Sequence, residues 1–277
     1  MRTAANTSEL RNLLPHCGSP IILVPTMGAL HPGHSSLISL AREKAGQTGT
    51  VIVSIFVNPI QFDRIGDLES YPRALAADLV ICERQGADIV FAPKASGMYA
   101  PDRSVTVIES SLSKHLCGAT RPGHFDGVCT VVLKLFNLTR CDAAVFGEKD
   151  FQQLAIIRRM IRDLDLGVEI IPHPTVRDDD GLAKSSRNAR LTPEHRADAP
   201  RIRKALSKAS EKTSPHDMLA TARASIEASP HARIDYLSLV DAETLLPVET
   251  LTSRSVLACA VFYGDVRLID HIVIPPR

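Results

Sequence analysis

The chain has 277 residues, of which 44% are hydrophobic and 23% charged, and its formal net charge is +1. This length suits one large domain or two of ordinary size, and the composition is typical of a globular protein. A nearly neutral chain without tryptophan lacks the basic surface and the stacking platform of nucleic-acid-binding proteins, so we expect no nucleic-acid partner and no electrostatic attraction to a membrane.

The first 175 residues alternate short apolar segments with helical patterns. We predict strands at 21–24, 51–57, 88–91, 143–146 and 168–171, and helices at 35–45, 74–85, 128–137 and 152–164. This alternation predicts a Rossmann-like, doubly wound α/β domain over residues 1–175, with helices on both faces of a parallel sheet. Such sheets bind ligands at the carboxyl ends of their strands, where this chain has polar segments at 31–34, 58–61 and 147–153.

A second, smaller domain is predicted over residues 176–277. A stretch rich in proline and aspartate, residues 172–181, is typical of a linker or hinge. Thr192-Pro193 and Ser214-Pro215 each combine an N-cap with proline at the first helical position, and Pro200 should interrupt the first of the two helices. Strands follow at 234–240, 256–263 and 266–274, which predicts a C-terminal α+β domain.

The strongest functional signal follows the first strand, where residues 24–34 spell VPTMGALHPGH. The pattern predicts a tight turn into a helix, with His31 and His34 at the junction and Gly33 between them. A helix N-terminus can hold phosphate, and two imidazoles there can hydrogen-bond an oxyanion whose charge grows during reaction. The motif therefore predicts nucleotide chemistry at phosphorus. A zinc site is disfavoured because the HExxH glutamate and a nearby cysteine are missing, whereas two unrelated surface histidines remain an alternative.

Polar residues after two other strands suit a small substrate and a nucleotide. The neutral amides of Asn58 and Gln61 match hydroxyl and carboxylate groups, although Asn58 can equally cap a turn. Lys149 can neutralise phosphate and Asp150 can accept from ribose, although Asp150 can equally open a helix. Gln153 lies one turn into that helix and should point toward the same site.

Just beyond the linker, Lys184-Ser185-Ser186-Arg187 place two hydroxyls between two cations. This composition suits an oxyanion clamp. The alternative is a polar loop that precedes a helix.

The cysteines and the N-terminus indicate a compartment. None of the six cysteines forms a CxxC pair, so neither a structural zinc site nor a redox motif is predicted. The first fifteen residues lack the apolar core of a signal peptide, and no apolar run is long enough to cross a bilayer. We therefore expect a cytoplasmic protein with reduced thiols and no membrane partner.

These segments, in this order, resemble the pantoate–β-alanine ligase (pantothenate synthetase) family over nearly the whole chain. HxGH alone occurs throughout a wide superfamily of nucleotidyltransferases and synthetases, whereas the full set is specific to this family. The segments that carry the resemblance are 25–31 with 33–34, 56–59 with 61–62, 67–68 with 71–73, 121–125, 134–137, 147–150 with 152–153, 174–177 and 185–188.

The resemblance implies an enzyme that condenses pantoate with β-alanine, using ATP and Mg²⁺, through pantoyl adenylate, and that releases pyrophosphate and AMP. It also implies a homodimer. The residues implied to be catalytic are His34 as the usual candidate for the acid, His31, Lys149 and Arg187. Those implied to contact ATP are Met27, Gly28, Ala29, Leu30, His31, Pro32, Gly33, His34, Gly147, Glu148, Lys149, Asp150, Val176, Lys184, Ser185, Ser186 and Arg187. Those implied to hold pantoate or β-alanine are Asn58, Gln61 and Gln153.

The chain departs from the family pattern at three places. Lys184 stands where the family usually has an apolar residue, so it can add a phosphate contact or merely extend along the surface. The segment 63–66 lacks the small-residue start that is common there. Ala77 replaces the first member of an acidic pair associated with metal binding, which leaves Asp78 as the candidate Mg²⁺ ligand.

Two hypotheses from other classes compete. An adenylyltransferase that moves AMP onto a phosphate shares HxGH and the Ser/Arg clamp, but it needs a basic acceptor site, and Gln61 and Gln153 are neutral. A non-catalytic nucleotide sensor needs neither the histidines nor the clamp. The products distinguish the three hypotheses. A ligase releases AMP and pyrophosphate when β-alanine is present, an adenylyltransferase releases pyrophosphate alone, and a sensor releases neither.

Overall fold

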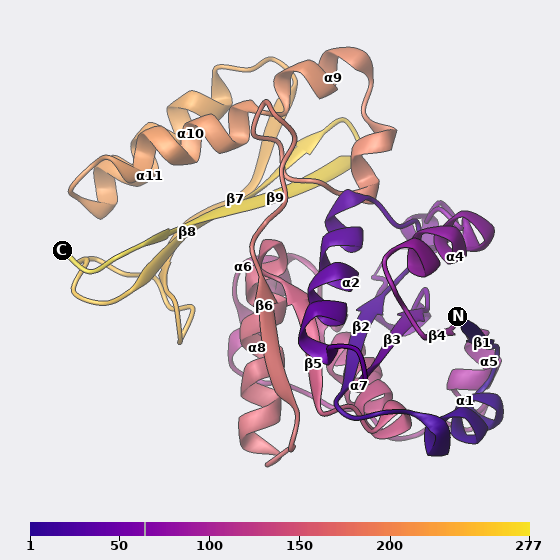
Figure 1. Ribbon diagram of the computed structural model, residues 1–277. Coiled ribbons are helices and arrows are strands. Elements are labelled where there is room, and N and C mark those ends of the chain that lie inside the picture. The colour runs from indigo at the N-terminus through magenta and orange to yellow at the C-terminus, as the bar shows by residue number, and fades with distance from the viewer. Residues whose placement is uncertain (64) are drawn as a thin grey trace. The chain divides into compact units, whose positions relative to one another are not determined.

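The computed structural model describes residues 1–63 and 65–277 (Figure 1). Arg64, part of the 63–66 segment noted above, lies outside the described residues. The chain divides into two compact units, and the last boundary between them along the sequence lies between Pro174 and Thr175. The first unit comprises Met1–Glu109, Pro122–Glu148 and Ile156–Pro174, and the second comprises Ser110–Arg121, Lys149–Ala155 and Thr175–Arg277.

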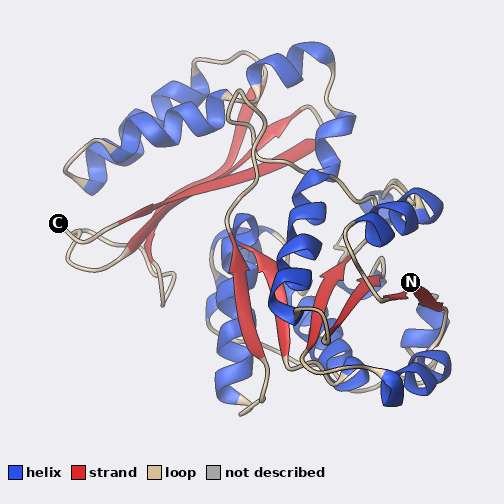
Figure 2. Ribbon diagram, viewed as in Figure 1, coloured by secondary structure: helices blue, strands red, loops and turns tan. Residues whose placement is uncertain are grey.

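The first unit is built on a parallel sheet (Figure 2). Its strands, within the described residues, are β1 (Arg2–Ala4), β2 (Ile21–Thr26), β3 (Thr50–Ile55), β4 (Ile89–Phe91), β5 (Ala143–Gly147) and β6 (Glu169–His173). They lie in the order β1-β4-β3-β2-β5-β6, and every pair is parallel. The chain reverses its direction of travel across the sheet between β2 and β5, so the predicted doubly wound fold is confirmed. The carboxyl ends of these two strands are where such sheets bind ligands.

Helices of the first unit pack on this sheet through apolar side chains. The helices of the N-terminal half are α1 (Thr7–Leu13), α2 (Pro32–Ala45), α3 (Ile65–Glu69), α4 (Leu75–Arg84), α5 (Ala95–Met98), α6 (Leu116–Thr120), α7 (His124–Thr139) and α8 (Phe151–Asp163). On one face, Ile38 of α2 and Cys82 of α4 pack with Val24 and Val53. None of the described residues of α7, which contacts β2, belongs to that cluster. Among the described residues, no helix combines the length and the hydrophobicity needed to span a membrane.

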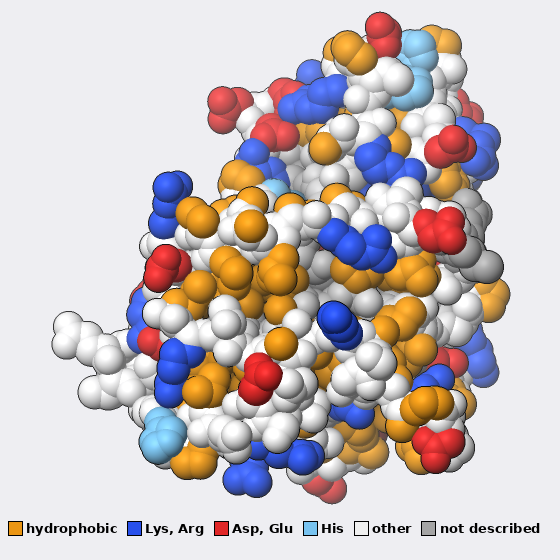
Figure 3. Space-filling model, turned by 90° about the vertical axis from the view of Figure 1, so that its right-hand side faces the viewer, with side chains coloured by type: hydrophobic (Ala, Val, Ile, Leu, Met, Phe, Trp, Pro, Cys, Tyr) orange, Lys and Arg blue, Asp and Glu red, His pale blue; other side chains and the backbone are white. Residues whose placement is uncertain are grey.

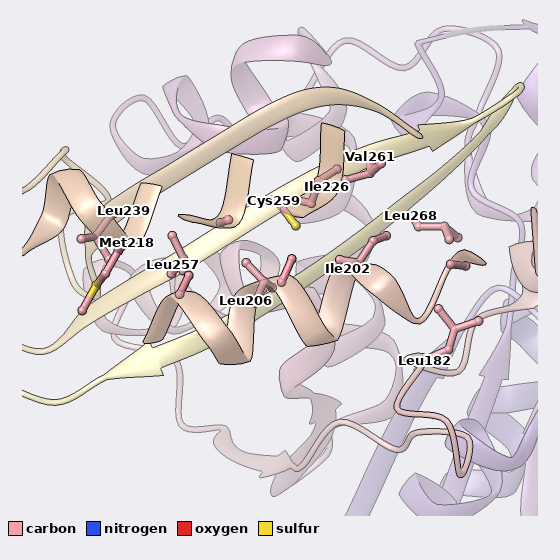
Figure 4. Packing of buried hydrophobic residues seen from close by; sticks show 14 of the residues in the cluster. Leu182, Ile202, Leu206, Met218, Ile226, Leu239, Leu257, Cys259, Val261 and Leu268 are labelled. Carbon is pink, nitrogen blue, oxygen red and sulfur yellow. The ribbon is translucent and has the colours of Figure 1, made fainter. Parts of the chain in front are cut away.

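The second unit places helices on an antiparallel sheet. Its strands are β7 (Ala232–Asp241), β8 (Ser255–Tyr263) and β9 (Val266–Ile274), and its longer helices are α9 (Pro193–Asp198), α10 (Arg201–Ser210) and α11 (Pro215–Glu227). Ile202 and Leu206 of α10 and Met218 of α11 pack with Leu257 and Cys259 of β8, as Figure 4 shows. The α+β expectation is therefore confirmed for this part of the chain.

The predicted helix signals act as proposed. The Ser214 hydroxyl accepts from the backbone N–H of Asp217 at 3.0 Å, and the Thr192 hydroxyl accepts from that of His195 at 3.2 Å. Pro200 separates α9 from α10. Other boundaries differ: the strand expected at 51–57 ends at Ile55, α7 begins at His124 instead of residue 128, and neither β1 nor α1 was expected.

Charged and apolar side chains share the surface. On the face shown in Figure 3, Lys and Arg lie among Asp and Glu, and hydrophobic side chains form several groups between them. The most exposed large hydrophobic side chains are Val105 and Ile108, which are 74% and 67% exposed and lie outside every described strand and helix.

Candidate active site

The HxGH segment leaves β2 through a turn with an unusual backbone conformation. Gly28 has φ +81° and Ala29 has φ +50°, so two successive residues adopt the left-handed conformation. A Cβ at Gly28 would lie 3.0 Å from Asp78 Oδ2 and 3.0 Å from a methyl carbon of Ile55. Glycine is therefore required at position 28 both for its conformation and for the close approach of its neighbours.

The two histidines cap α2, and this fixes their tautomers. His31 is the N-cap, and its Nδ1 accepts from the backbone N–H of Gly33 at 3.1 Å. Nδ1 of His34 accepts in turn from the backbone N–H of His31 at 3.3 Å, and the two ring centroids lie 4.0 Å apart. A nitrogen that accepts a backbone proton cannot also carry one, so each neutral ring holds its proton on Nε2. The arrangement presents Nε2–H donors beside a helix N-terminus.

Asp78, the candidate metal ligand, is instead bound to this turn. It lies on α4, it is only 2% exposed, and its two oxygens accept from the backbone N–H groups of Ala29 at 3.0 Å and Leu30 at 2.8 Å. Among the described residues, no group of three or more His, Cys, Asp or Glu side chains could hold a metal ion. The surroundings of Asp78 therefore do not fit a resident Mg²⁺ site.

Asn58 and Gln61 form one hydrogen-bonded network after β3. The Asn58 amide donates to Gln61 Oε1 at 2.9 Å and to the backbone carbonyl of Gly127 at 3.0 Å, and its oxygen accepts from the Tyr99 hydroxyl at 2.8 Å. Gln61 Nε2 donates to Met27 Sδ at 3.2 Å. Asn58 is 1% exposed and Gln61 8% exposed. Asn58 thus orients Gln61, whose Nε2 donates, among the described residues, to a weak sulfur acceptor. Substrate contact by either residue stays a prediction.

Gly127 of α7 makes this network possible. A Cβ there would lie 2.5 Å from the carbonyl oxygen of Ile60 and 2.6 Å from the Cα of Gln61. The His124 ring also hydrogen-bonds the backbone oxygen of Gln61 at 2.7 Å. These contacts were not predicted from the sequence, where 121–125 was noted only as part of a family segment. The available signals were the histidine within that segment and the glycine two residues after it.

The residues after β5 divide between the two units. Gly147 and Glu148 belong to the first, whereas Lys149, Asp150 and Gln153 belong to the second. Lys149 Nζ lies 3.5 Å from a carboxylate oxygen of Asp150 and is half-buried. The Asp150 side chain is exposed, and Gln153 is half-buried on α8.

The neighbouring Gln152 has a different role. Its side chain is 5% exposed, its Nε2 donates to the carbonyls of Leu112 and His115, and its Oε1 accepts from the backbone N–H of Cys117. All four residues belong to the second unit. Gln152 therefore holds the 112–117 segment in place, which leaves Gln153 as the amide of this pair with an exposed surface.

In the second unit, residues 176–184 form a short hairpin. The Lys184 N–H donates to the Val176 carbonyl at 2.9 Å, and Gly181 has φ +93° in the turn. Arg177 anchors the hairpin to β9 through two bonds of 2.7 and 2.8 Å to Asp270, which is 6% exposed. Ser185 then caps the 3-10 turn Ser186–Arg190 by accepting from the Arg187 N–H at 3.2 Å. The structure thus places Val176 beside Lys184 and places Ser185, Ser186 and Arg187 directly after them.

Lys184 lies in a cluster of ion pairs that also includes Asp178, Asp180 and Arg196. These partners were not predicted from the sequence. The Lys184 ammonium contacts the Asp178 carboxylate, and Arg196 of α9 bonds Asp178 at 3.2 Å and Asp180 at 2.6 Å. The hydrogen bond from Arg196 lowers the pKa of Asp180 below its usual range, and the same bond raises the pKa of Arg196. The sequence assigned 178–180 to a linker, because an acidic run carries no indication of its partners.

The comparisons with known proteins identify the family of this chain. The sequence model of the family described as pantoate-beta-alanine ligase matches residues 2–273. A pantothenate synthetase of Akkermansia muciniphila is 52% identical over 98% of this chain and 99% of its own length, and one of Trichlorobacter lovleyi is 51% identical over 93% and 92%.

Solved structures agree as well. Pantothenate synthetase from Thermus thermophilus superposes with a TM-score of 0.94 at 42% identity, over 100% of each chain. Pantoate-beta-alanine ligase from Francisella tularensis, solved with beta-gamma ATP and beta-alanine, superposes with a TM-score of 0.83 at 32% identity, over 99% of this chain and 97% of that one. The chain therefore belongs to the pantoate–β-alanine ligase family.

Proposed function

We propose that the enzyme joins pantoate and β-alanine in two steps through pantoyl adenylate. In the first step a pantoate carboxylate oxygen attacks the α-phosphorus of ATP, and the bond to the bridging oxygen of pyrophosphate breaks. In the second step the neutral amine of β-alanine attacks the acyl carbon, the bond from that carbon to the AMP oxygen breaks, and the nitrogen loses a proton. The observation that carries the proposal is the pair of histidines whose Nδ1 atoms are both bound to the backbone of the HxGH turn.

Negative charge gathers on the phosphoryl oxygens in the first step, and the proposed roles of the histidines follow from their tautomers. His34, which the resemblance implies to be the acid, and His31 would each direct a neutral Nε2–H toward those oxygens as a hydrogen-bond donor. Donors of this kind, fixed before the reaction, each contribute roughly a hundredfold to a thousandfold in rate. We propose that the turn from Met27 to Gly33 lines the phosphate-binding site, although most of its backbone N–H groups already donate to Thr26, Asp78 and the two histidine rings.

Charge repulsion between a carboxylate and a polyphosphate must also be offset. We propose that Lys149 and Arg187 supply cations, that Ser185, Ser186 and Lys184 bind phosphate oxygens, and that Gly147, Glu148, Asp150 and Val176 contact the nucleoside. The Ser185 oxygen accepts from the Arg187 N–H, so its hydroxyl proton can still be donated to a phosphate. The ATP complex of the Francisella relative supports ATP as the substrate.

The amides are proposed to recognise the organic substrates. Gln61 and Gln153 bind the hydroxyl and carboxylate groups of pantoate, and Gln61 also contacts β-alanine. Asn58 serves mainly by holding Gln61. Neutral amides at these positions favour a ligase over an adenylyltransferase, whose phosphate acceptor would require cations.

We propose that the enzyme uses Mg²⁺ in the form of the Mg²⁺–ATP complex, so that the ion is part of the substrate. This assignment is supported by the engagement of both Asp78 oxygens by backbone N–H groups. The pyrophosphate that leaves would carry the ion with it.

We further propose that the enzyme is a homodimer in the cytoplasm. Val105 and Ile108 are 74% and 67% exposed in a segment outside the described helices and strands, and a second copy of the same segment would cover them. Among the described residues all six cysteines are free, which suits a reducing compartment. Sedimentation should give twice the chain mass, and Ile108→Asp should shift the protein to monomer; a monomeric parent protein would contradict the proposal.

The decisive experiment measures AMP and pyrophosphate release with pantoate, ATP and Mg²⁺, with and without β-alanine. We expect one AMP per pantothenate, strictly dependent on β-alanine. Pyrophosphate release that needs a phosphorylated acceptor in place of pantoate would identify an adenylyltransferase instead, and ATP binding with no product would identify a sensor.

A further inference from the structure

We infer that Asp78 is a positioning residue of the HxGH turn and does not bind a metal ion. The inference rests on the proposed function, in which the histidines of this turn act on the α-phosphate. The two oxygens of the carboxylate accept from two successive backbone N–H groups, Ala29 at 3.0 Å and Leu30 at 2.8 Å. A charged acceptor makes each of these bonds stronger than one between neutral groups.

The bonds hold a conformation that the chain would not otherwise keep. Ala29 has φ +50°, which is unfavourable for a residue with a Cβ. Its amide and the next one both point at Asp78, so the carboxylate offsets the strain of the turn. Glycine at position 28 allows the approach, because a Cβ there would lie 3.0 Å from both Asp78 Oδ2 and a methyl carbon of Ile55.

The turn conformation that Asp78 holds also determines where the two histidines lie. Leu30 precedes His31, the N-cap of α2, and the His31 N–H is the donor to His34 Nδ1. A shift of the backbone at Ala29 and Leu30 would therefore move both imidazoles. Misplacing reacting groups by about 1 Å can cost on the order of a hundredfold in rate.

The surroundings of Asp78 supply backbone donors and a helix terminus in place of a metal ion. Asp78 lies in the first turn of α4, where the helix dipole favours an anion. None of the described residues forms an ion pair with it, and it is 2% exposed. The two backbone N–H groups and the helix terminus are therefore the groups that stabilise this buried carboxylate.

The test compares Asp78→Asn with Glu83→Gln, a charge-removing control on the exposed side of the same helix. In Asp78→Asn an amide N–H faces a backbone N–H, so the turn should shift. We expect pantoate-dependent pyrophosphate release to fall about tenfold to a hundredfold while the Mg²⁺ concentration for half-maximal rate, at fixed ATP, stays unchanged. Glu83→Gln should match the parent protein in both.

Two further measurements separate positioning from other roles. In the ligand-free protein, the ring ¹⁵N resonances of His31 and His34 should shift in Asp78→Asn and not in Glu83→Gln; this readout stands even if the proposed reaction is wrong. Ala29→Gly, which removes the strain, should restore part of the rate lost by Asp78→Asn. If Asp78→Asn alone does not fold, Ala29→Gly is compared with the double variant. Unshifted rings, or a raised Mg²⁺ requirement with no rescue by Ala29→Gly, would overturn the inference.

Discussion

The two segments that carry most of the proposed ATP ligands are held in different ways. The HxGH turn is fixed by hydrogen bonds that its backbone N–H groups donate to the buried carboxylate of Asp78 and to the histidine rings. The segment around Ser185 is flanked by ion pairs between half-exposed side chains, Lys184 with Asp178 and Arg196 with Asp178 and Asp180. Buried backbone bonds persist at any ionic strength, whereas exposed pairs are worth about 0–1 kcal/mol and are screened by salt.

This difference suggests a division of labour. The turn is preformed for a reaction at phosphorus, where geometry matters most. The hairpin that precedes Ser185 is anchored because Arg177 binds the nearly buried Asp270. The half-exposed Lys184 at the end of this hairpin can exchange its carboxylate partner for another anion. We therefore expect the largest losses from the turn, intermediate ones from the clamp and the substrate amides, and the smallest from the exchangeable ion pairs.

The largest effect should come from His34. His34→Ala removes both the backbone cap and the Nε2–H donor, whereas His34→Asn keeps an oxygen near the position of Nδ1 and loses only the donor. Both variants should lose about a hundredfold to a thousandfold in pantoate-dependent pyrophosphate release. His34→Asn should unfold closer to the temperature of the parent protein, because a cap contributes about 0.5–2 kcal/mol. Near-normal pyrophosphate release by folded His34→Asn would contradict the proposed role.

The same contrast explains what the sequence could predict. The periodicity of hydrophobic residues and the turn residues predicted the alternating fold. The short β1 and α1 were not predicted, because elements of three to seven residues show too little periodicity. HxGH and Ser-Ser-Arg were found as motifs. Asp78 lies 49 residues from the turn residue Ala29 that it holds, and the ion-paired Asp178 and Arg196 lie 18 residues apart. No local pattern encodes which distant groups a fold brings together.

The next largest effect should come from Arg187. Arg187→Ala should raise the ATP requirement and slow adenylate formation roughly tenfold to a hundredfold, because a charge-assisted contact to phosphate is lost. It should spare the attack of β-alanine on supplied pantoyl adenylate, since pyrophosphate has already left. Quenched-flow assays of each half-reaction measure this, with Arg190→Ala, an exposed arginine of the same turn, as the control.

The clamp also predicts a change in protection. ATP should slow hydrogen exchange across residues 176–190 in the parent protein and less so in Arg187→Ala. Equal damage to both half-reactions, together with unchanged exchange on adding ATP, would refute the role of this segment as a phosphate clamp.

A smaller effect is expected at the amide pair on α8. Gln153→Ala should weaken the binding of pantoate by about 1–3 kcal/mol, because a polar group of the substrate loses its hydrogen-bond partner. The binding of ATP should weaken much less. Gln152→Ala should instead lower the unfolding temperature, since it removes three hydrogen bonds to the 112–117 segment. Calorimetric titration and thermal unfolding of the two variants distinguish these outcomes. Equal loss of ATP and pantoate affinity in Gln153→Ala would mark that residue as structural.

The smallest effect belongs to Lys184, whose ammonium pairs with Asp178 in the absence of ATP. We expect it to exchange this carboxylate for a phosphate, which carries more charge, while Arg196 continues to neutralise Asp178. Lys184→Met should then raise the KM for ATP by about twofold to fivefold, the range of exposed ion pairs. Asp178→Asn, which releases the lysine, should lower that KM by a similar factor.

The double variant makes this prediction specific. Once Lys184 is methionine, Asp178→Asn should no longer change the KM for ATP, because it has no lysine to release. Asp180→Asn, which removes a partner of Arg196 alone, serves as the control and should leave KM near that of the parent protein. Added salt should shrink the difference between Lys184→Met and the parent protein, since exposed charges are screened within about 10 Å at 0.1 M. An unchanged KM in Lys184→Met would mean that this lysine only extends along the surface, and the tip of the clamp would then be as fixed as the HxGH turn.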